Sequence, residues 1–212
     1  MKDIKTYILE SSQEKKYKNN IPQDIKSFCY KMMINLDYSK LQETNDYDPD
    51  RFEKSKENEE LLMNSLSDDS YDFMTTSQYY ATINKENKWE NLSSKEQTEF
   101  YRKNGNLIIL KNEKPIYFID IKIGSNNDLV GSINLGSLSE FNENGYYLCI
   151  AKKSGKYKII SHKDLVNAVK ENPKLLNPVI NKSYKGFDIT WNGEKLTSEY
   201  FIKGSDLNNK FE

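Results

Sequence analysis

Residues 115–123 read Pro-Ile-Tyr-Phe-Ile-Asp-Ile-Lys-Ile, and the fold that this sequence predicts is built around them. Aromatic and β-branched residues are typical of a β-strand. Successive side chains of a strand point to opposite faces, so Asp120 and Lys122 are expected side by side, opposite the neighbouring isoleucines. Two interpretations are open. The segment is an edge strand with one solvated face, or it carries a metal-dependent phosphodiesterase site in which the carboxylate holds Mg²⁺ and the lysine orients or deprotonates the attacking water.

Further strands are predicted on both sides of this segment. Runs of apolar, aromatic and threonine residues predict one or two strands within 71–84, and single strands at 106–110, 146–151, 156–160 and 187–191. A turn at 111–114 joins the predicted strand at 106–110 to the central strand at 115–123. Asn192-Gly193 is typical of a tight hairpin turn, so the last strand is expected to begin a hairpin.

Helices are predicted between the strands, at 24–36, 49–66, 93–104 and 161–172. In the first, apolar residues recur at spacings of three and four, which is typical of an amphipathic helix. Ser93 and Glu96 have the spacing of a capping box. The mixture of elements predicts an α/β (α+β) chain in which an N-terminal helical region, residues 1–70, packs on a core formed by residues 71–212.

Composition and charge exclude several classes of function. The formal net charge is −1, from 31 basic and 32 acidic residues, which argues against a non-specific polybasic nucleic-acid binder. One histidine, His162, rules out a histidine-rich metal site, and its place at a helix start predicts a surface residue. The two cysteines, Cys29 and Cys149, lie in apolar surroundings and are expected to be buried free thiols, as in a reducing compartment.

The absence of recognisable targeting signals favours a cytoplasmic protein. The first residues contain no apolar stretch of the signal-peptide kind, and no apolar run approaches the length of a membrane span. We therefore expect no membrane partner.

The order of elements around residues 105–153 resembles the core of the PD-(D/E)xK nuclease superfamily, which includes many restriction endonucleases. In that family a helix leads to a strand bearing an Asp, and a hairpin leads to a second strand that ends in (D/E)xK. Here 93–103 is the corresponding helix, and Asp120 and Lys122 supply the DxK. The resemblance implies a restriction-endonuclease-like mixed sheet flanked by helices.

The resemblance also implies a site. Asp120 is the metal ligand for Mg²⁺ or Mn²⁺, and Lys122 is the residue that orients the water. The position of the family's first Asp is occupied by Asn106, whose amide oxygen lacks the charge of a carboxylate. An amide oxygen can still ligate Mg²⁺, so either Asn106, Asp72 or Glu99 completes the metal site, with Glu96 as a further candidate acid on the preceding helix, or the site is weakened or inactive.

The predicted function is hydrolysis of DNA phosphodiester bonds by a metal-dependent endonuclease, with a homodimer implied by the resemblance. Lysines around one turn either form a solvated hairpin or contact phosphates: Lys152, Lys153, Lys156 and Lys158. The alternative is a non-enzymatic binding or inhibitor protein on a degenerate nuclease-like or unrelated α+β fold. Asn106 favours this alternative, as does the acidic segment 40–72, which could dock a basic protein partner or mimic DNA.

Overall fold

A five-stranded mixed sheet lies at the centre of the chain. The structure is a computed structural model that describes residues 20–42, 50–66, 72–124, 130–134, 139–153, 155–171, 177–179, 186–192 and 195–203. The strands of the main sheet follow the order β1 (Asp72–Thr75), β2 (Leu107–Lys111), β3 (Lys114–Gly124), β5 (Gly145–Ala151) and β6 (Lys156–Ser161). Only β3 and β5 are parallel neighbours in this sheet; its other pairs are antiparallel.

The predicted strand at 115–123 is confirmed as β3, but it is not an edge strand. It is hydrogen-bonded to β2 on one side and to β5 on the other. The turn before it contains Asn112 and Glu113, both with positive φ (51° and 64°). Such a turn matches the right-handed twist of the two strands that it joins. Asp120 and Lys122 therefore lie on an interior strand, and the burial of two charged side chains there needs an explanation.

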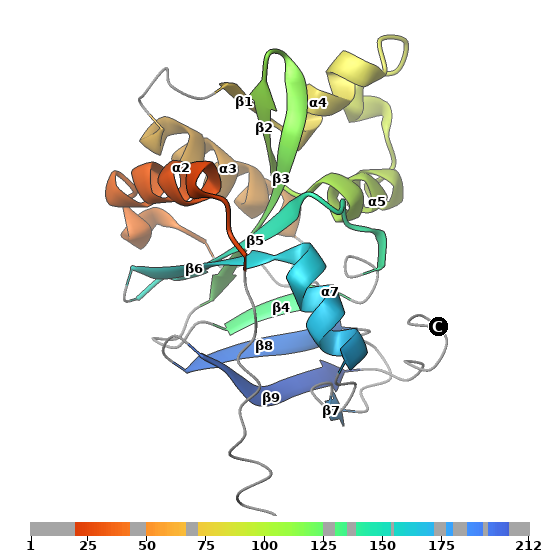
Figure 1. Cartoon of the computed structure of the whole chain (residues 1–212). Helices are drawn as coiled ribbons and strands as arrows, with labels where there is room; N and C mark the ends of the chain where they lie inside the picture. The colour runs from red at the N-terminus through yellow and green to blue at the C-terminus, as the bar shows by residue number, and fades with distance from the viewer. Residues whose placement is uncertain are drawn as a thin grey trace, which may run out of the picture.

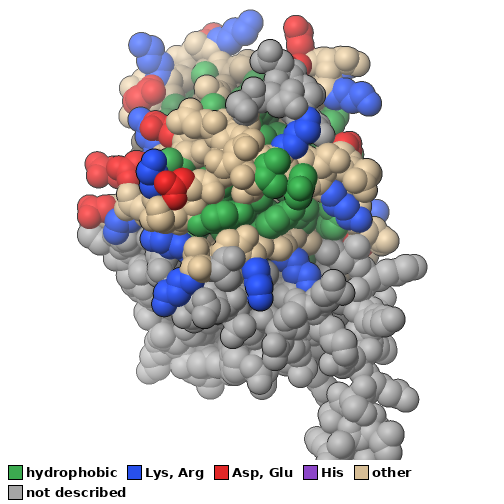
Figure 2. All heavy atoms as spheres, turned by 90° about the vertical axis from the view of Figure 1, so that its left-hand side faces the viewer, with side chains coloured by type: hydrophobic (Ala, Val, Ile, Leu, Met, Phe, Trp, Pro, Cys, Tyr) green, Lys and Arg blue, Asp and Glu red, His purple; other side chains and the backbone are tan. Residues whose placement is uncertain are grey.

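Two helices, α2 (Gln23–Ile34) and α3 (Arg51–Ser65), lie on one side of the main sheet (Figure 1). The first confirms the predicted amphipathic helix and buries five apolar side chains: Ile25, Phe28, Cys29, Met32 and Met33. They form one core with Leu62 of α3 and with strand residues such as Ile119 and Leu148. A short 3-10 helix, η1 (Tyr38–Lys40), follows α2. On this side of the molecule, Figure 2 shows a hydrophobic patch between charged borders.

The helices α4 (Thr76–Ile83) and α5 (Ser94–Asn104) lie on the other side of β3 (Figure 1). The ring of Tyr79 in α4 contacts Phe118 of β3, with centroids 6.2 Å apart. The strand prediction for 71–84 is wrong beyond Thr75. Thr75 and Gln78 form a capping box, whose reciprocal hydrogen bonds satisfy free backbone groups at a helix start. The predicted capping box at Ser93 is confirmed.

A second sheet has the order β4 (Val130–Asn134), β8 (Gly186–Asn192), β9 (Lys195–Lys203) and β7 (Asn177–Val179). It contains the predicted hairpin, since β8 and β9 pair antiparallel. The helix α7 (His162–Glu171) follows β6 and lies in front of this region in Figure 1.

The α+β class is confirmed, whereas the closer likeness to restriction endonucleases stays a prediction. Parts of the predicted N-terminal region lie outside the described residues, namely 1–19, 43–49 and 67–70. The last two belong to the acidic segment, most of which the structure describes. Within the ranges that the structure describes, no helix has the length and apolar character needed to cross a membrane.

Candidate functional site

Asp120 and Lys122 lie together on one face of β3, as the alternation of the strand predicts. Lys122 Nζ is 2.9 Å from Asp120 Oδ2, and the side chains are 24% and 12% exposed, respectively. The parallel register sets them beside Tyr147 and Cys149 of β5. A buried charge is tolerated when it is paired, so this ion pair satisfies two groups that an interior strand could not otherwise hold.

The Cys149 thiol next to this pair is not a nucleophile. Burial raises its pKa to about 12; the Lys122 ammonium lowers the pKa and the Asp120 carboxylate raises it, but both effects are smaller. The thiolate is the reactive form of cysteine, so a thiol with this pKa is inert near neutral pH. Cys29 is also buried and free, and both predictions of buried free thiols are confirmed.

Hydrogen bonds hold the Asn106 side chain away from the Asp120 carboxylate. Its Oδ1 accepts a hydrogen bond from the Ile121 backbone N–H (2.8 Å), and its Nδ2 donates to Glu59 Oε1 (2.9 Å). It lines a cavity of about 20 Å³ together with Ile121 and Ile123, which point to the face opposite Asp120. Its amide therefore links the start of β2 to β3 and α3. The structure does not bring Asn106 and Asp120 into one ligand set.

Glu59 of α3 accepts the hydrogen bond from Asn106 and lines the same cavity. The sequence did not identify it as a candidate site residue. It is 4% exposed. Burial raises the pKa of its carboxyl group to about 7, although hydrogen bonds from Asn106 and Tyr101 lower it. The pKa of Tyr101 is raised by burial and by the Glu59 charge. Spacing could have found Glu59, because it precedes the buried Leu62 by one helical turn and so shares its face.

Asp72 is too far from Asp120 to share an ion with it. Asp72 pairs with Leu110 at one end of β2, whereas Asp120 lies just beyond the pair of Leu107 and Ile119 at the other end. With about 3.3 Å per residue and about 4.8 Å per strand, the two Cα atoms are about 16 Å apart. Ligands of Mg²⁺ lie about 2 Å from the ion. Asp72 is thus not the second acid for Asp120.

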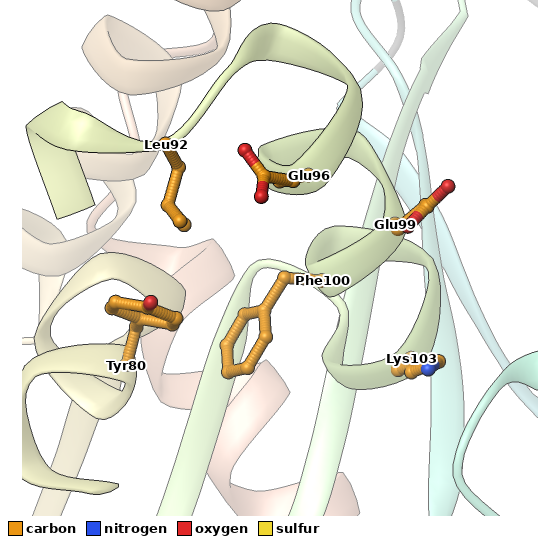
Figure 3. A pocket seen from close by; sticks show the side chains of 6 residues that line it. All are labelled: Tyr80, Leu92, Glu96, Glu99, Phe100 and Lys103. Carbon is orange, nitrogen blue, oxygen red and sulfur yellow. The ribbon is translucent and has the colours of Figure 1, made fainter. Parts of the chain in front are cut away.

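Glu96 and Glu99 line an open groove on α5, shown in Figure 3, together with Tyr80, Leu92, Phe100 and Lys103. The groove has a volume of about 190 Å³ and includes neither Asp120 nor Lys122. Glu96 accepts hydrogen bonds from Ser93 N and Oγ (2.8 and 2.7 Å), so its carboxylate caps the helix. Glu99 Oε1 lies 3.9 Å from Lys95 Nζ at the surface. These two carboxylates therefore lie apart from Asp120 and Lys122.

The residues predicted to hold Mg²⁺ therefore do not assemble into one site. Asp120 is paired with Lys122, Asn106 is bonded to Glu59, and Asp72 and Glu99 lie elsewhere. In the part of the chain that the structure describes, no three His, Cys, Asp or Glu side chains are grouped closely enough to hold a metal ion. These donors do not fit the octahedral oxygen coordination of Mg²⁺.

The four lysines predicted to contact phosphates surround the turn between β5 and β6. Lys153 and Lys156 are exposed, and Lys152 and Lys158 are half-buried. Lys158 pairs with Cys149 across the sheet and so shares the face of Lys122. The lysines thus form part of a basic strand edge, next to the turn rather than beside the Asp120 carboxylate.

His162 is not a surface residue, contrary to the prediction. It is 6% exposed, and its Nδ1 lies 2.9 Å from the Tyr147 hydroxyl. Phe141 packs against its ring, with centroids 5.3 Å apart. Burial lowers the pKa of the imidazole to about 4, so it is neutral near pH 7. The contacts come from β5 and from residue 141, which are distant in sequence, so the local pattern at Ser161 could not indicate burial.

Replacing Asn106 with aspartate tests whether this position belongs to a metal site. We expect Asn106→Asp to lose about 1–3 kcal/mol of unfolding free energy, because it removes the donor to Glu59 and adds a second buried acid. Urea unfolding at neutral and mildly alkaline pH measures the loss, with Asn91→Asp at an exposed position as the control. A variant that instead gains stability from Mg²⁺ would show that residue 106 completes an ion site.

Comparisons of the chain with protein-family models, with curated proteins and with solved structures found no match.

Proposed function

We propose that this chain is a non-catalytic protein that acts by binding a partner. The observation that carries the proposal is that the polar groups with catalytic spacing in the sequence are bonded to one another inside the fold. Asp120 pairs with Lys122, and the amide of Asn106 spans Glu59 and the Ile121 backbone. Each bond satisfies a buried polar group, and buried groups of this kind need such partners for stability alone.

The surroundings of the Asp120 carboxylate support the same conclusion. A carboxylate that binds Mg²⁺ needs other oxygen ligands next to it and an open path for the ion. The Asp120 side chain is only 12% exposed and has an ammonium group at 2.9 Å. The acids considered as second ligands lie on β1 and on the outer side of α5. The ion pair thus fits a structural role within the sheet.

A metal-dependent nuclease is the second candidate, and one observation favours it. Asp120 and Lys122 share one face of an interior strand that has an antiparallel neighbour and a parallel neighbour. This adjacency is the arrangement that a DxK motif requires. The candidate also requires another acid beside Asp120, which the described residues do not supply.

Incubation of the purified chain with plasmid DNA and Mg²⁺ or Mn²⁺ separates the two candidates. We expect no cleavage by the wild type, by Asp120→Ala or by Lys122→Ala. We also expect the thermal midpoint of the wild type to be unchanged by either metal, because no set of carboxylates gains ligands. Circular dichroism establishes that each variant is folded.

Cleavage by the wild type that both variants lose would overturn the non-catalytic proposal and support the nuclease. A metal-dependent rise in the thermal midpoint that Asp120→Ala abolishes would have the same meaning, since it would show that the carboxylate binds the ion. Cleavage that the variants retain would identify a contaminating nuclease.

A further inference from the structure

The outward side of α2 exposes two large hydrophobic residues side by side. Tyr30 is 57% exposed and Ile34 is 58% exposed. They are four positions apart, so they lie on the same face of the helix. In the described part of the chain, only one other large hydrophobic residue is exposed to this extent, Ile83 on α4. Two of the three therefore gather on one helix face.

Two more aromatic side chains extend this patch. Tyr38 of η1 and Tyr157 of β6 are half-buried. Both pack against the core to which α2 contributes, and the Tyr38 hydroxyl donates a hydrogen bond to the Met33 carbonyl oxygen of α2 (2.6 Å). Burial raises the pKa of Tyr157, and Cys29, Tyr38 and Tyr30 raise it further. A Cβ atom on Gly155 would lie 3.0 Å from the ring of Tyr38, which shows that the β5–β6 turn packs against that ring. We call Tyr30, Ile34, Tyr38 and Tyr157 the tyrosine face.

Charges of opposite sign border the tyrosine face. Figure 2 shows hydrophobic side chains between a border where acidic side chains predominate, with Lys or Arg among them, and a border of Lys or Arg side chains. The helix α3, which packs against α2, exposes three glutamates and one lysine, Glu53, Glu57, Glu60 and Lys56, so this edge is acidic on balance. On the basic side, Lys26 is exposed one turn before Tyr30, and Lys153 is exposed at the β5–β6 turn. The surface thus combines an apolar centre with two complementary edges.

We propose that the tyrosine face binds a second copy of this chain as a two-fold symmetric dimer. In such a dimer the same surface meets itself, and each border of one copy faces the opposite border of the other. Apolar centres then pack together, and the acidic edge of each copy meets the basic edge of its partner. An apolar patch between charged rims is typical of interaction sites on proteins. The inference goes beyond the proposed function because it names the surface and its occupant.

Sedimentation velocity on the full chain tests the proposal, over concentrations from about 1 μM to about 1 mM, where weak dimers dissociate. We expect the mass to rise from 24.9 kDa towards twice this value with concentration. The double variant Tyr30→Glu, Ile34→Asp is expected to raise the dissociation constant at least about 30-fold, as central hot-spot residues do. Both residues are exposed, so circular dichroism is expected to show a folded variant.

The matched control is Ile83→Asp, because Ile83 is 53% exposed and lies outside the tyrosine face. We expect this variant to dimerise as the wild type does, and we expect added salt to weaken the wild-type dimer through the charged edges. A wild type that stays monomeric at every concentration would overturn the inference. Equal weakening by Ile83→Asp and by the double variant would also overturn it, because association would not involve this face. Neither result would bear on plasmid cleavage, which tests the proposed function separately.

Discussion

Glu59→Gln is expected to make the chain more stable than the wild type above pH 7. A glutamate carboxyl group in water has a pKa of 4.5, and in the folded chain burial raises the pKa of Glu59 to about 7. Between these values the folded chain binds a proton that the unfolded chain has lost. The stability that this proton contributes is therefore fully present below pH 4.5 and is lost as the pH rises through 7. This shift corresponds to about 2–4 kcal/mol.

Glutamine removes this dependence because it carries no charge at any pH. It also keeps an oxygen that can accept the hydrogen bond from Asn106 Nδ2, which the wild-type carboxylate accepts at 2.9 Å. Urea unfolding of both proteins across the window from pH 4.5 to 7 and above it measures the effect. From pH 4.5 to 7 the free energy of unfolding of the wild type is expected to fall relative to that of the variant, because only the wild type carries the Glu59 carboxyl group.

Glu53→Gln is the matched control, since Glu53 lies on the same helix and is exposed. It is expected to leave the slope unchanged. His162 contributes an opposite slope, because burial lowers its pKa from 6.5 to about 4 and stability falls as the pH drops through that range. Both Glu59→Gln and the wild type retain His162, so the difference between them isolates Glu59. A wild type whose stability rises from pH 6.5 upward would contradict the buried ionisation of Glu59.

Gly105→Ala is expected to destabilise the fold by about 3 kcal/mol or more, the second large effect. Gly105 ends α5 with φ 71° and ψ −152°, a conformation open essentially to glycine alone. A Cβ atom there would lie 2.5 Å from the backbone oxygen of Ile119 and 2.9 Å from the backbone nitrogen of Asp120. Both atoms belong to the interior strand β3, which cannot move aside without disturbing its hydrogen bonds to the strands on both sides.

Gly155→Ala provides the comparison for this prediction. Gly155 also has a positive φ (64°), but its added Cβ would meet the side chain of Tyr38 at 3.0 Å rather than a backbone. We expect it to lose only about 1–2 kcal/mol, since the half-buried ring of Tyr38 can shift more readily than the backbone of an interior strand. Thermal and urea unfolding of both variants measure the difference. Equal losses would show that backbone conformation, and not the contact with β3, sets the cost at Gly105.

Local sequence patterns predicted the structure correctly where a single segment contains the whole pattern. The alternation in 115–123 predicted that Asp120 and Lys122 share a face, and their 2.9 Å ion pair agrees. The spacing of apolar residues in 24–36 predicted α2, and Ser93 with Glu96 predicted the start of α5. The prediction was wrong at 76–83, where tyrosine and threonine residues indicated a strand. The capping box at Thr75 and Gln78 and the contact of Tyr79 with Phe118 favour the helix instead.

The α+β class, the central strand and the pairing of Asp120 with Lys122 could all be read from the order of residues, because strand alternation and helix spacing act over a few neighbours. What surrounds that pair depended on the packing of the folded chain. Packing placed Asn106 on Glu59, Asp72 about 16 Å away and Glu99 on an outer groove. It also buried His162 and Glu59 and set their pKa values. These contacts depend on which elements meet across long stretches of chain, and no local pattern specifies them. For Glu59, the spacing from Leu62 marks the buried face of the helix, but only packing supplies its partner Asn106.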